Sequence, residues 1–272
     1  MLNFLCLGSG SSGNGYCLWT ENGGIMIDAG ISLRMLKRHF QVFGLRWEHL
    51  QGIFITHDHA DHIKSVGKLA AEYAIPVYAT ELVHEGIDRN YCVSPHLKTE
   101  SKHFITPDQP LVFGDFTVTA FSVPHDSTDC VGYRIESDGI RFCLITDVGH
   151  VTERIKAEVE AANYLVLESN HDHEMLQAGP YPAYLKGRIA GPTGHLSNHE
   201  AAELLANSSS PALRHVWLCH LSEENNHPVL ARKTVDAVLR IYGIIPGVDF
   251  KVDVLRRKVP SEIYQLSNGQ EQ

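Results

Sequence analysis

The chain has 272 residues, of which 43% are apolar and 20% are charged, and its formal net charge is −9. These proportions are ordinary for a globular protein, and no stretch approaches the roughly 18 apolar residues of a membrane-spanning helix. The negative charge argues against a strongly basic surface for nucleic acid, although bound dications would offset part of that charge locally.

In chain order, many short apolar runs are interspersed with a few amphipathic segments. The apolar runs predict strands over residues 3–7, 16–20, 24–27, 52–55, 77–79, 116–123, 130–136, 140–145, 164–167, 216–219 and 249–255. The amphipathic segments predict helices over residues 32–40, 63–73, 81–90, 151–161, 198–206 and 228–242. This mixture predicts an α/β fold in which helices cover sheets.

No repeat and no linker rich in proline, glycine or serine divides the chain. We therefore predict a single domain over residues 1–266 and a disordered tail over residues 267–272, which read SNGQEQ. The first residues read as a strand and not as a signal peptide, and the six cysteines show no CxxC spacing. We expect buried free thiols and a cytoplasmic protein, and both a monomer and a homodimer fit the sequence.

The strand ends carry an unusual set of polar side chains. Five ionisable residues come within three residues of the end of an apolar run: His57, His125, Asp147, Glu168 and His220. Rigid scaffolds present functional groups at strand ends and in the loops beyond them. The pattern therefore predicts a functional site built from these strand ends.

The densest polar stretch is THDHADH, residues 56–62, in a chain whose compositional outlier is histidine with 17 copies. His57 and His59 point to the same side of an extended chain, so one cation can bind both. Asp61 and His62 can turn toward a second cation beside the first. The pattern H-x-H-x-D-H therefore predicts two metal ions, and the alternative is a solvated turn in which Asp61 caps the following helix.

These motifs resemble those of the metallo-β-lactamase-fold hydrolases. THDHADH is followed, in the order of that family, by SVPHDS, LITDVGH and LCHLS. The resemblance implies a four-layer αββα sandwich with its site at one edge of two sheets. It also implies two sets of metal ligands and a bridge: His57, His59 and His125 for the first metal, Asp61, His62 and His220 for the second, and Asp147 between them.

The ligand types bear on the metal and on the chemistry. Imidazole and carboxylate without thiolate suit two divalent ions of zinc, manganese or iron, with no sharp choice among them. Two such ions can bridge and deprotonate one water, and the hydroxide attacks the substrate while Asp61 orients it. Taken alone, His125 could be a turn histidine, Asp147 could cap a helix, and His220 could be bonded to backbone.

Two further segments, YLVLESNHD and GHLSNHEAAELLA, resemble ribonuclease Z. By that resemblance Glu168 orients His195, and His195 protonates the leaving oxygen of a phosphodiester. The alternative is that His195 merely precedes a helix that Ser197 or its neighbour caps. Only 22 residues separate His125 from Asp147 (147 − 125), too few for the tRNA-gripping arm of many ribonucleases Z.

The fuller match is to the YycJ/WalJ group of bacterial family members, through GSGSSGNGY, VPHDSTDCVGYRI, ESNHDHEML, YPAYLKGRIAGPTGHLSN and CHLSEENNHP. Members of that group are regarded as DNA-directed nucleases, which implies an exonuclease with a repair role that prefers DNA to RNA. One alternative keeps the site but acts on a small phosphodiester, a thioester or a lactone. Another alternative is a metal-stabilised binding module. Seven candidate ligands argue against it, because a structural zinc site is normally complete with four ligands.

Candidate substrate contacts lie near these motifs. The segment LKGR carries Lys186 and Arg188 and is the best candidate for a phosphate contact. The others are Ser197, Asn225 and Asn226, and the two asparagines fit equally a role in shaping their loop. The glycine-rich GSGSSGNG fits a tight turn between the first two strands better than a phosphate cradle.

Overall fold

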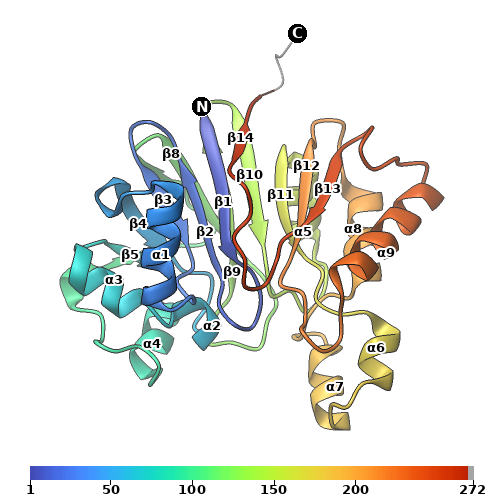
Figure 1. Ribbon diagram of the computed structural model, residues 1–272, viewed down its shortest axis with the longest axis horizontal. Coiled ribbons are helices and arrows are strands. Elements are labelled where there is room, and N and C mark those ends of the chain that lie inside the picture. Colours follow the sequence, from blue (N-terminus) through green and yellow to red (C-terminus); the bar gives the residue numbers. More distant parts are fainter. Residues whose placement is uncertain (269–272) are drawn as a thin grey trace.

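The computed structural model describes residues 1–268, and its centre is a pair of seven-stranded sheets (Figure 1). The first sheet contains, in spatial order, β14 (Tyr264–Leu266), β1 (Leu2–Gly8), β2 (Gly15–Trp19), β3 (Gly24–Ile27), β4 (Leu50–Phe54), β5 (Val77–Ala79) and β6 (Lys102–Phe104). The second contains β13 (Lys251–Val254), β12 (His215–Cys219), β11 (Tyr164–Glu168), β10 (Ile140–Ile145), β9 (Val131–Ser137), β8 (Phe116–Ser122) and β7 (Leu111–Phe113).

Helices cover the outer face of each sheet (Figure 1). Beside the first sheet lie α1 (Leu33–Phe43), the short α2 (Ala60–Ile63), α3 (Val66–Tyr73) and α4 (Glu81–Arg89). Beside the second lie α5 (Glu153–Ala161), α8 (Asn198–Ser208) and α9 (Pro228–Ile241), while α6 (His173–Ala178) and α7 (Ala183–Ile189) project below it. Two 3₁₀ turns are η1 (Trp47–His49) and η2 (Thr99–Ser101). Among the described residues, no helix combines the length and apolar character needed to cross a bilayer.

Alternating strand side chains produce the layers. In β10, Phe142 and Leu144 join the core between the two sheets, whereas Cys143 and Ile145 join the core between the second sheet and its helices. A third core lies between the first sheet and α1, α3 and α4. The predicted four-layer αββα sandwich is therefore confirmed.

Parallel strands bring the functional loops together. In the first sheet β3, β4 and β5 run parallel, and in the second sheet β10, β11 and β12 do so. Because parallel strands end at the same edge of a sheet, the loops after β4, β10, β11 and β12 can meet there. This edge is at the bottom of Figure 1.

The predicted strands and helices all correspond to elements of the structure, with one predicted helix divided. The helix expected over residues 63–73 breaks between α2 and α3, where the Ser65 hydroxyl donates to the carbonyl of Ile31 at 2.6 Å. The sequence did not predict β6, β7, β14, α6 or α7, which are too short to show a periodic pattern. Of the expected tail, Ser267 accepts a hydrogen bond from the Tyr164 hydroxyl at 2.8 Å, and residues 269–272 lie outside the described residues.

Candidate metal centre

The residues predicted for the metal centre lie together at the edge where β4, β10, β11 and β12 end. Their candidate ligand atoms form four overlapping groups, each within 4.8 Å: His57, His59 and His125; His57, His62 and Asp147; Asp61, His62 and His220; and Asp147, Glu168, His195 and His220. Because the groups share members, they make one continuous centre. The capping alternative for Asp61 does not apply, since Asp61 lies within the first turn of α2 and its N-cap is His59.

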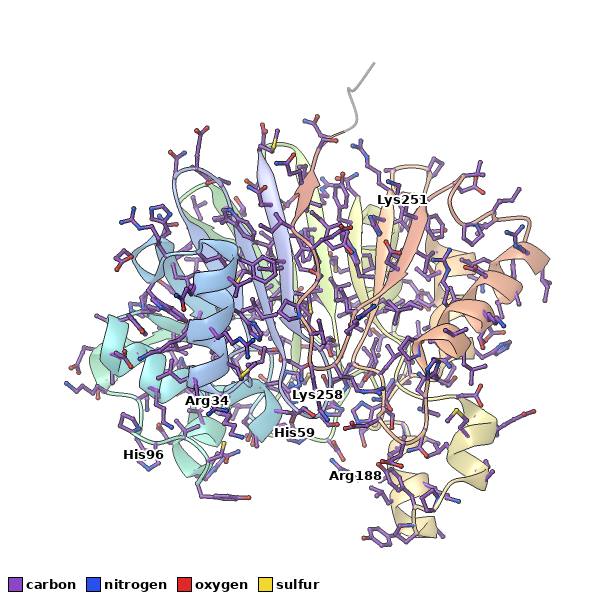
Figure 2. All side chains as sticks on the ribbon, viewed as in Figure 1. Arg34, His59, His96, Arg188, Lys251 and Lys258 are labelled. Carbon is purple, nitrogen blue, oxygen red and sulfur yellow. The ribbon has the colours of Figure 1, made fainter. Side chains whose placement is uncertain are left out.

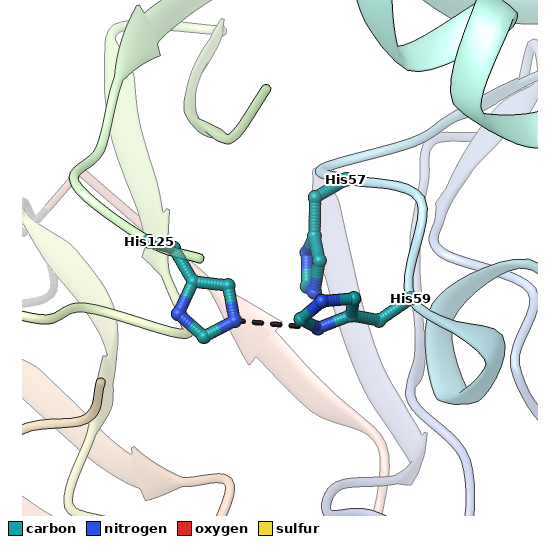
Figure 3. A group of neighbouring side chains, drawn as sticks. All are labelled: His57, His59 and His125. Carbon is teal, nitrogen blue, oxygen red and sulfur yellow. Dashed lines mark hydrogen bonds between the residues drawn. The ribbon is translucent and has the colours of Figure 1, made fainter. Parts of the chain in front are cut away.

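We call His57, His59 and His125 the three-histidine cluster (Figure 3). Each ring has one nitrogen beside an oxygen: His57 Nδ1 at 3.0 Å from Thr56 Oγ1, His59 Nε2 at 3.2 Å from Asp126 O, and His125 Nδ1 at 3.0 Å from Gly194 O. A ring N–H donated to each oxygen leaves the opposite nitrogen of each ring with a lone pair. The partners therefore fix the tautomers, and the free nitrogens face inward.

The free nitrogens of this cluster need a common partner. Nε2 of His125 lies 3.3 Å from Nδ1 of His59, and Nε2 of His57 is buried without a hydrogen bond in the described chain (Figure 3). Converging lone pairs are unfavourable without a shared cation or proton. Burial lowers the pKa of both His57 and His125, which keeps these rings in the neutral form that binds metal. The cluster therefore fits a divalent ion.

We call Asp61, His62 and His220 the mixed cluster. Here carboxylates hold the rings: Nδ1 of His62 lies 2.7 Å from Asp28 Oδ2, and Nδ1 of His220 lies 3.1 Å from Glu168 Oε1. The opposite nitrogens face Asp61, whose Oδ2 is 3.7 Å from His62 Nε2 and 3.4 Å from His220 Nε2. Carboxylates behind metal-binding histidines fix the rings and increase their basicity.

The carboxylates also change the charge of the mixed cluster. Although burial acts to lower it, Asp28 and other carboxylates raise the pKa of His62 well above its usual value. Against the same effect of burial, Asp147 and its neighbours raise the pKa of His220 to about 10. Burial acts to raise the pKa of Asp61, but the two histidines lower it to about 2. Without metal, protons therefore occupy this cluster.

Asp147 lies between the two clusters. Its Oδ2 is 3.3 Å from His62 Nε2, and its Oδ1 is 3.8 Å from His125 Nε2 and 3.4 Å from His220 Nδ1. Although burial acts to raise it, His220 and His62 hold the pKa of Asp147 well below its usual range. Asp147 is therefore an ionised carboxylate that faces both sets of candidate ligands.

Glu168, at the end of β11, connects four parts of the site. Its Oε1 accepts from Nδ1 of His195 at 2.8 Å and of His220 at 3.1 Å, and its Oε2 accepts from the N–H of Val148 at 2.7 Å and of Leu196 at 3.1 Å. Burial acts to raise the pKa of Glu168, but His195 and the hydrogen bonds lower it to about 2. Glu168 in turn raises the pKa of His195 against the effect of burial. Nε2 of His195 has no hydrogen bond within the described chain, and the side chain is 17% exposed.

The predicted substrate contacts have partners within the chain. These bonds are Lys186 Nζ to Gln177 O (2.6 Å), Arg188 to the Asp126 carboxylate (2.5 and 3.1 Å), Glu200 N to Ser197 Oγ (3.2 Å), Asn225 Nδ2 to Ser222 Oγ (3.3 Å) and Asn226 Nδ2 to Ser169 O (2.9 Å). Ser197 caps α8, as the alternative for the His195 segment supposed. Asn225 and Asn226 are buried, which supports the loop-shaping alternative for both.

The sequence analysis missed two residues behind the ligands, Asp28 and Asn14. The buried carboxylate of Asp28 accepts from the Thr56 hydroxyl and contacts His62. Asn14, in the glycine-rich turn, places its side-chain nitrogen 2.9 Å from His62 Nε2 and donates its main-chain N–H to Asp61 O at 2.8 Å. The sequence contained a signal for Asp28, because this residue directly follows the predicted strand 24–27. In the structure Asp28 has a left-handed backbone (φ +59°), as Asp147 (φ +55°) and His220 (φ +52°) do.

Comparisons with known proteins agree with this geometry. The family described as Beta-lactamase superfamily domain matches residues 24–221. The chain is 36% identical over 262 residues to the exodeoxyribonuclease YycJ of Bacillus anthracis (96% of this chain, 98% of that protein). It is also 36% identical over 246 residues to the exodeoxyribonuclease WalJ of Streptococcus pneumoniae serotype 2 (90% of this chain, 91% of that protein). The metallo-β-lactamase fold protein YhfI from Bacillus subtilis has a similar crystal structure, with a TM-score of 0.71 at 20% identity over 96% of this chain and 100% of that one. The chain therefore belongs to the beta-lactamase superfamily, as a metal-dependent hydrolase of the YycJ/WalJ group.

Proposed function

We propose that this hydrolase uses two divalent metal ions to cleave phosphodiester bonds of DNA from a strand end. The observation that carries the proposal is the position of Asp147, whose oxygens lie 3.3 Å from His62 Nε2 and 3.8 Å from His125 Nε2. A carboxylate between two ligand sets suits a pair of ions, and such pairs, about 3.5–4 Å apart, recur in phosphatases and nucleases.

Each ion has its own ligands in this proposal: His57, His59 and His125 for one, Asp61, His62 and His220 for the other, and Asp147 for both. Imidazole and carboxylate donors suit zinc or manganese, and also iron. Bound there, the ions supply Lewis acidity and lower the pKa of coordinated water.

The chain's own groups orient the water and protonate the leaving oxygen. The attacking water gives up one proton to solvent as its oxygen bonds to phosphorus, and the bond from phosphorus to the leaving sugar oxygen breaks. Asp61 is ionised, with a pKa lowered to about 2, and its partly exposed side chain can accept a hydrogen bond from the attacking water. The leaving oxygen takes a proton from Nε2 of His195, whose opposite nitrogen Glu168 holds at 2.8 Å.

Support for DNA as the substrate comes from the relatives. Both are named exodeoxyribonucleases, and each alignment covers at least 90% of this chain at 36% identity. We extend to this chain the substrate in their names and the repair role expected for the group. The net charge of −9 keeps a small phosphodiester as the competing substrate.

The test compares two substrates and three variants. End-labelled single- and double-stranded DNA is incubated with Mn(II) or Zn(II) beside bis-p-nitrophenyl phosphate. Asp61→Ala is expected to abolish cleavage, and His195→Ala to lower kcat by about 10²–10⁴-fold because the leaving oxygen loses its acid. His199→Ala is the matched control, since His199 is 62% exposed and pairs with Glu203 on the surface.

Progressive shortening from one labelled end, lost in Asp61→Ala and kept in His199→Ala, would support an exonuclease with these roles. Turnover of the small diester without DNA cleavage would reject DNA and transfer the mechanism to a small phosphodiester. Full activity of His195→Ala on both substrates would reject its role as the acid.

A further inference from the structure

A cavity of about 320 Å³ lies beside the metal centre. Its walls come from the glycine-rich turn after β1, the start of α1, the residue after α2 and the segment after β13. Figure 2 shows Lys258, which lines this cavity, and His59 in the lower part of the molecule. None of the described residues that line it is acidic.

Three cationic side chains line this cavity: Lys64, Arg257 and Lys258. Lys64 is exposed and forms no ion pair within the described part of the chain. Arg257 donates to the main-chain oxygen of Ser222 at 2.9 Å, and Lys258 pairs with Glu223 at 2.8 Å while its side chain remains 58% exposed. In a chain with net charge −9, three cations in one lining concentrate positive potential, because among the described residues Lys258 alone of the three has a carboxylate partner.

The start of α1 adds the positive end of a helix dipole. Ser32 is the N-cap, but its side chain makes no capping bond, and the first turn contains no acidic residue. Both Ser32 and Met35 line the cavity, so the positive end of the helix lies at its wall. His39 also lines it, with 8% exposure and no ring hydrogen bond within residues 1–268. The ring is therefore a further polar group that a ligand in the cavity can contact.

The glycine-rich turn that lines the cavity also contacts the metal centre. Gly13 lines it, and the next residue, Asn14, donates its N–H to the carbonyl of Asp61 at 2.8 Å. A Cβ at Gly13 would lie 2.7 Å from the carbonyl oxygen of Gly30, at a φ of +143°, so the turn is closely packed and its main chain is a fixed wall. The same turn therefore lines the cavity and contacts the main chain of Asp61.

We propose that this cavity is a phosphate-binding subsite, which holds the DNA strand by a phosphate neighbouring the one that is cleaved. A phosphate matches the positive end of α1, the unpaired Lys64 and the two further cations. The inference rests on the proposed function for the identity of the strand. It adds this cavity to the earlier candidates Lys186 and Arg188, which have partners within the chain as Arg257 and Lys258 do.

The test reverses charge inside and outside the cavity by the same amount. Lys64→Glu with Lys258→Glu alters the cavity, and Lys233→Glu with Lys251→Glu is the control, because these two exposed lysines form no ion pair within the described chain. Figure 2 shows Lys251 at the edge opposite His59. The metal-loaded proteins bind a fluorescent phosphorothioate oligonucleotide, which resists cleavage, in a salt titration followed by anisotropy.

The cavity variant is expected to raise Kd at least about tenfold, and to reduce the log–log salt slope by about two, for two lost phosphate contacts. The ratio of kcat/KM on DNA to that on bis-p-nitrophenyl phosphate should fall by a similar factor. The control should stay within about twofold in both. Melting curves exclude misfolding, and Lys64→Ala alone should show about half of the change in slope. Oligonucleotides with and without terminal phosphates separate a terminal phosphate from an internal one.

The outcomes separate the two proposals. If the cavity variant cleaves and binds DNA as well as the control variant does, the subsite is overturned and the proposed exonuclease function stands. Weakened DNA binding in the cavity variant of a protein that does not cleave DNA would support the subsite and reject the nuclease. A wild-type protein that neither cleaves DNA nor binds it more tightly than the cavity variant would overturn both.

Discussion

The two halves of the metal centre hold their histidines differently. In the three-histidine cluster the ring partners are two main-chain carbonyls and one hydroxyl, whereas in the mixed cluster they are carboxylates. Burial lowers the pKa of His57 and His125 in the first cluster. In the second, carboxylates overcome burial and raise the pKa of His62 and His220.

The comparison shows that the hydrogen-bond partner behind a histidine decides the protonation state of its ring when no metal is bound. The three-histidine cluster is neutral and ready for a cation, whereas the mixed cluster must release protons when a cation binds. The first position should therefore load with less dependence on pH than the second. The predictions that follow use this difference, from the largest expected effect to the smallest.

The substitution Asp147→Asn should impair both halves of the metal centre at once, because Asp147 faces both sets of ligands. Asparagine keeps the shape and tolerates the left-handed backbone, but it removes the charge that faces both ligand sets. We expect kcat/KM for bis-p-nitrophenyl phosphate to fall by about a thousandfold, with less than two metals per chain by mass spectrometry.

The control for this prediction is Asp58→Asn, whose carboxylate accepts from Thr128 and belongs to none of the candidate ligand groups of the described chain. It should keep both metals and near-normal activity. Two metals per chain with normal activity in Asp147→Asn would contradict a shared carboxylate.

The substitution Asp28→Asn should weaken the mixed cluster more than the three-histidine cluster. It removes the carboxylate 2.7 Å behind His62, whereas it reaches the three-histidine cluster only through the Thr56 hydroxyl, which lies between Asp28 and His57. The affinity of the mixed cluster for its metal should fall by about 10–100-fold, and the three-histidine cluster should hold its metal. Titration calorimetry measures both, and equal weakening of the two positions would show that the halves are not independent.

The free energy of unfolding without metal should depend on pH in opposite ways for the histidines of the two clusters. A raised histidine pKa gives stability that is present below the ordinary value of 6.5 and is lost as pH rises toward the folded pKa, about 10 for His220. A lowered pKa, as in His57 and His125, gives stability that is present above 6.5 and is lost as pH falls. The free energy of unfolding in chelator should therefore peak near pH 6.5.

On each side of that maximum the slope is about 1.4 kcal/mol per pH unit for one proton. Urea denaturation across pH measures it, with metal-loaded protein as the comparison. Bound metal should flatten the alkaline side, because the rings are then already deprotonated. An alkaline slope that is identical with and without metal would contradict the assignment of His62 and His220.

The fold was predictable where patterns were long. The runs over 140–145 and 164–167 alternate or stay apolar for enough residues to identify β10 and β11. The strands β6, β7 and β14 have three residues each, and they form at sheet edges through pairing with neighbours that a local pattern does not contain. The break between α2 and α3 depends on Ser65 and the distant carbonyl of Ile31, so no local pattern predicts it.

The centre was predictable where residues of a motif are close in sequence or follow a strand. The sequence therefore predicted that His57, His59, Asp61, His62 and Glu168 belong to one site, and the structure brings them together. The substrate contacts were harder, because the charge of a loop does not reveal its partner. Arg188 is paired with Asp126 from a loop 62 residues away, a contact that only the fold creates.

The left-handed backbones of Asp28, Asp147 and His220 have a consequence for redesign of the centre. A residue other than glycine in this region costs on the order of 1–3 kcal/mol, and aspartate, asparagine and histidine are the side chains that tolerate it best. Any substitution at these positions must therefore satisfy two requirements: the new side chain must suit the new metal, and it must tolerate the left-handed main chain. A library that seeks a different metal preference should vary His57, His59 and His125, where the second requirement does not apply.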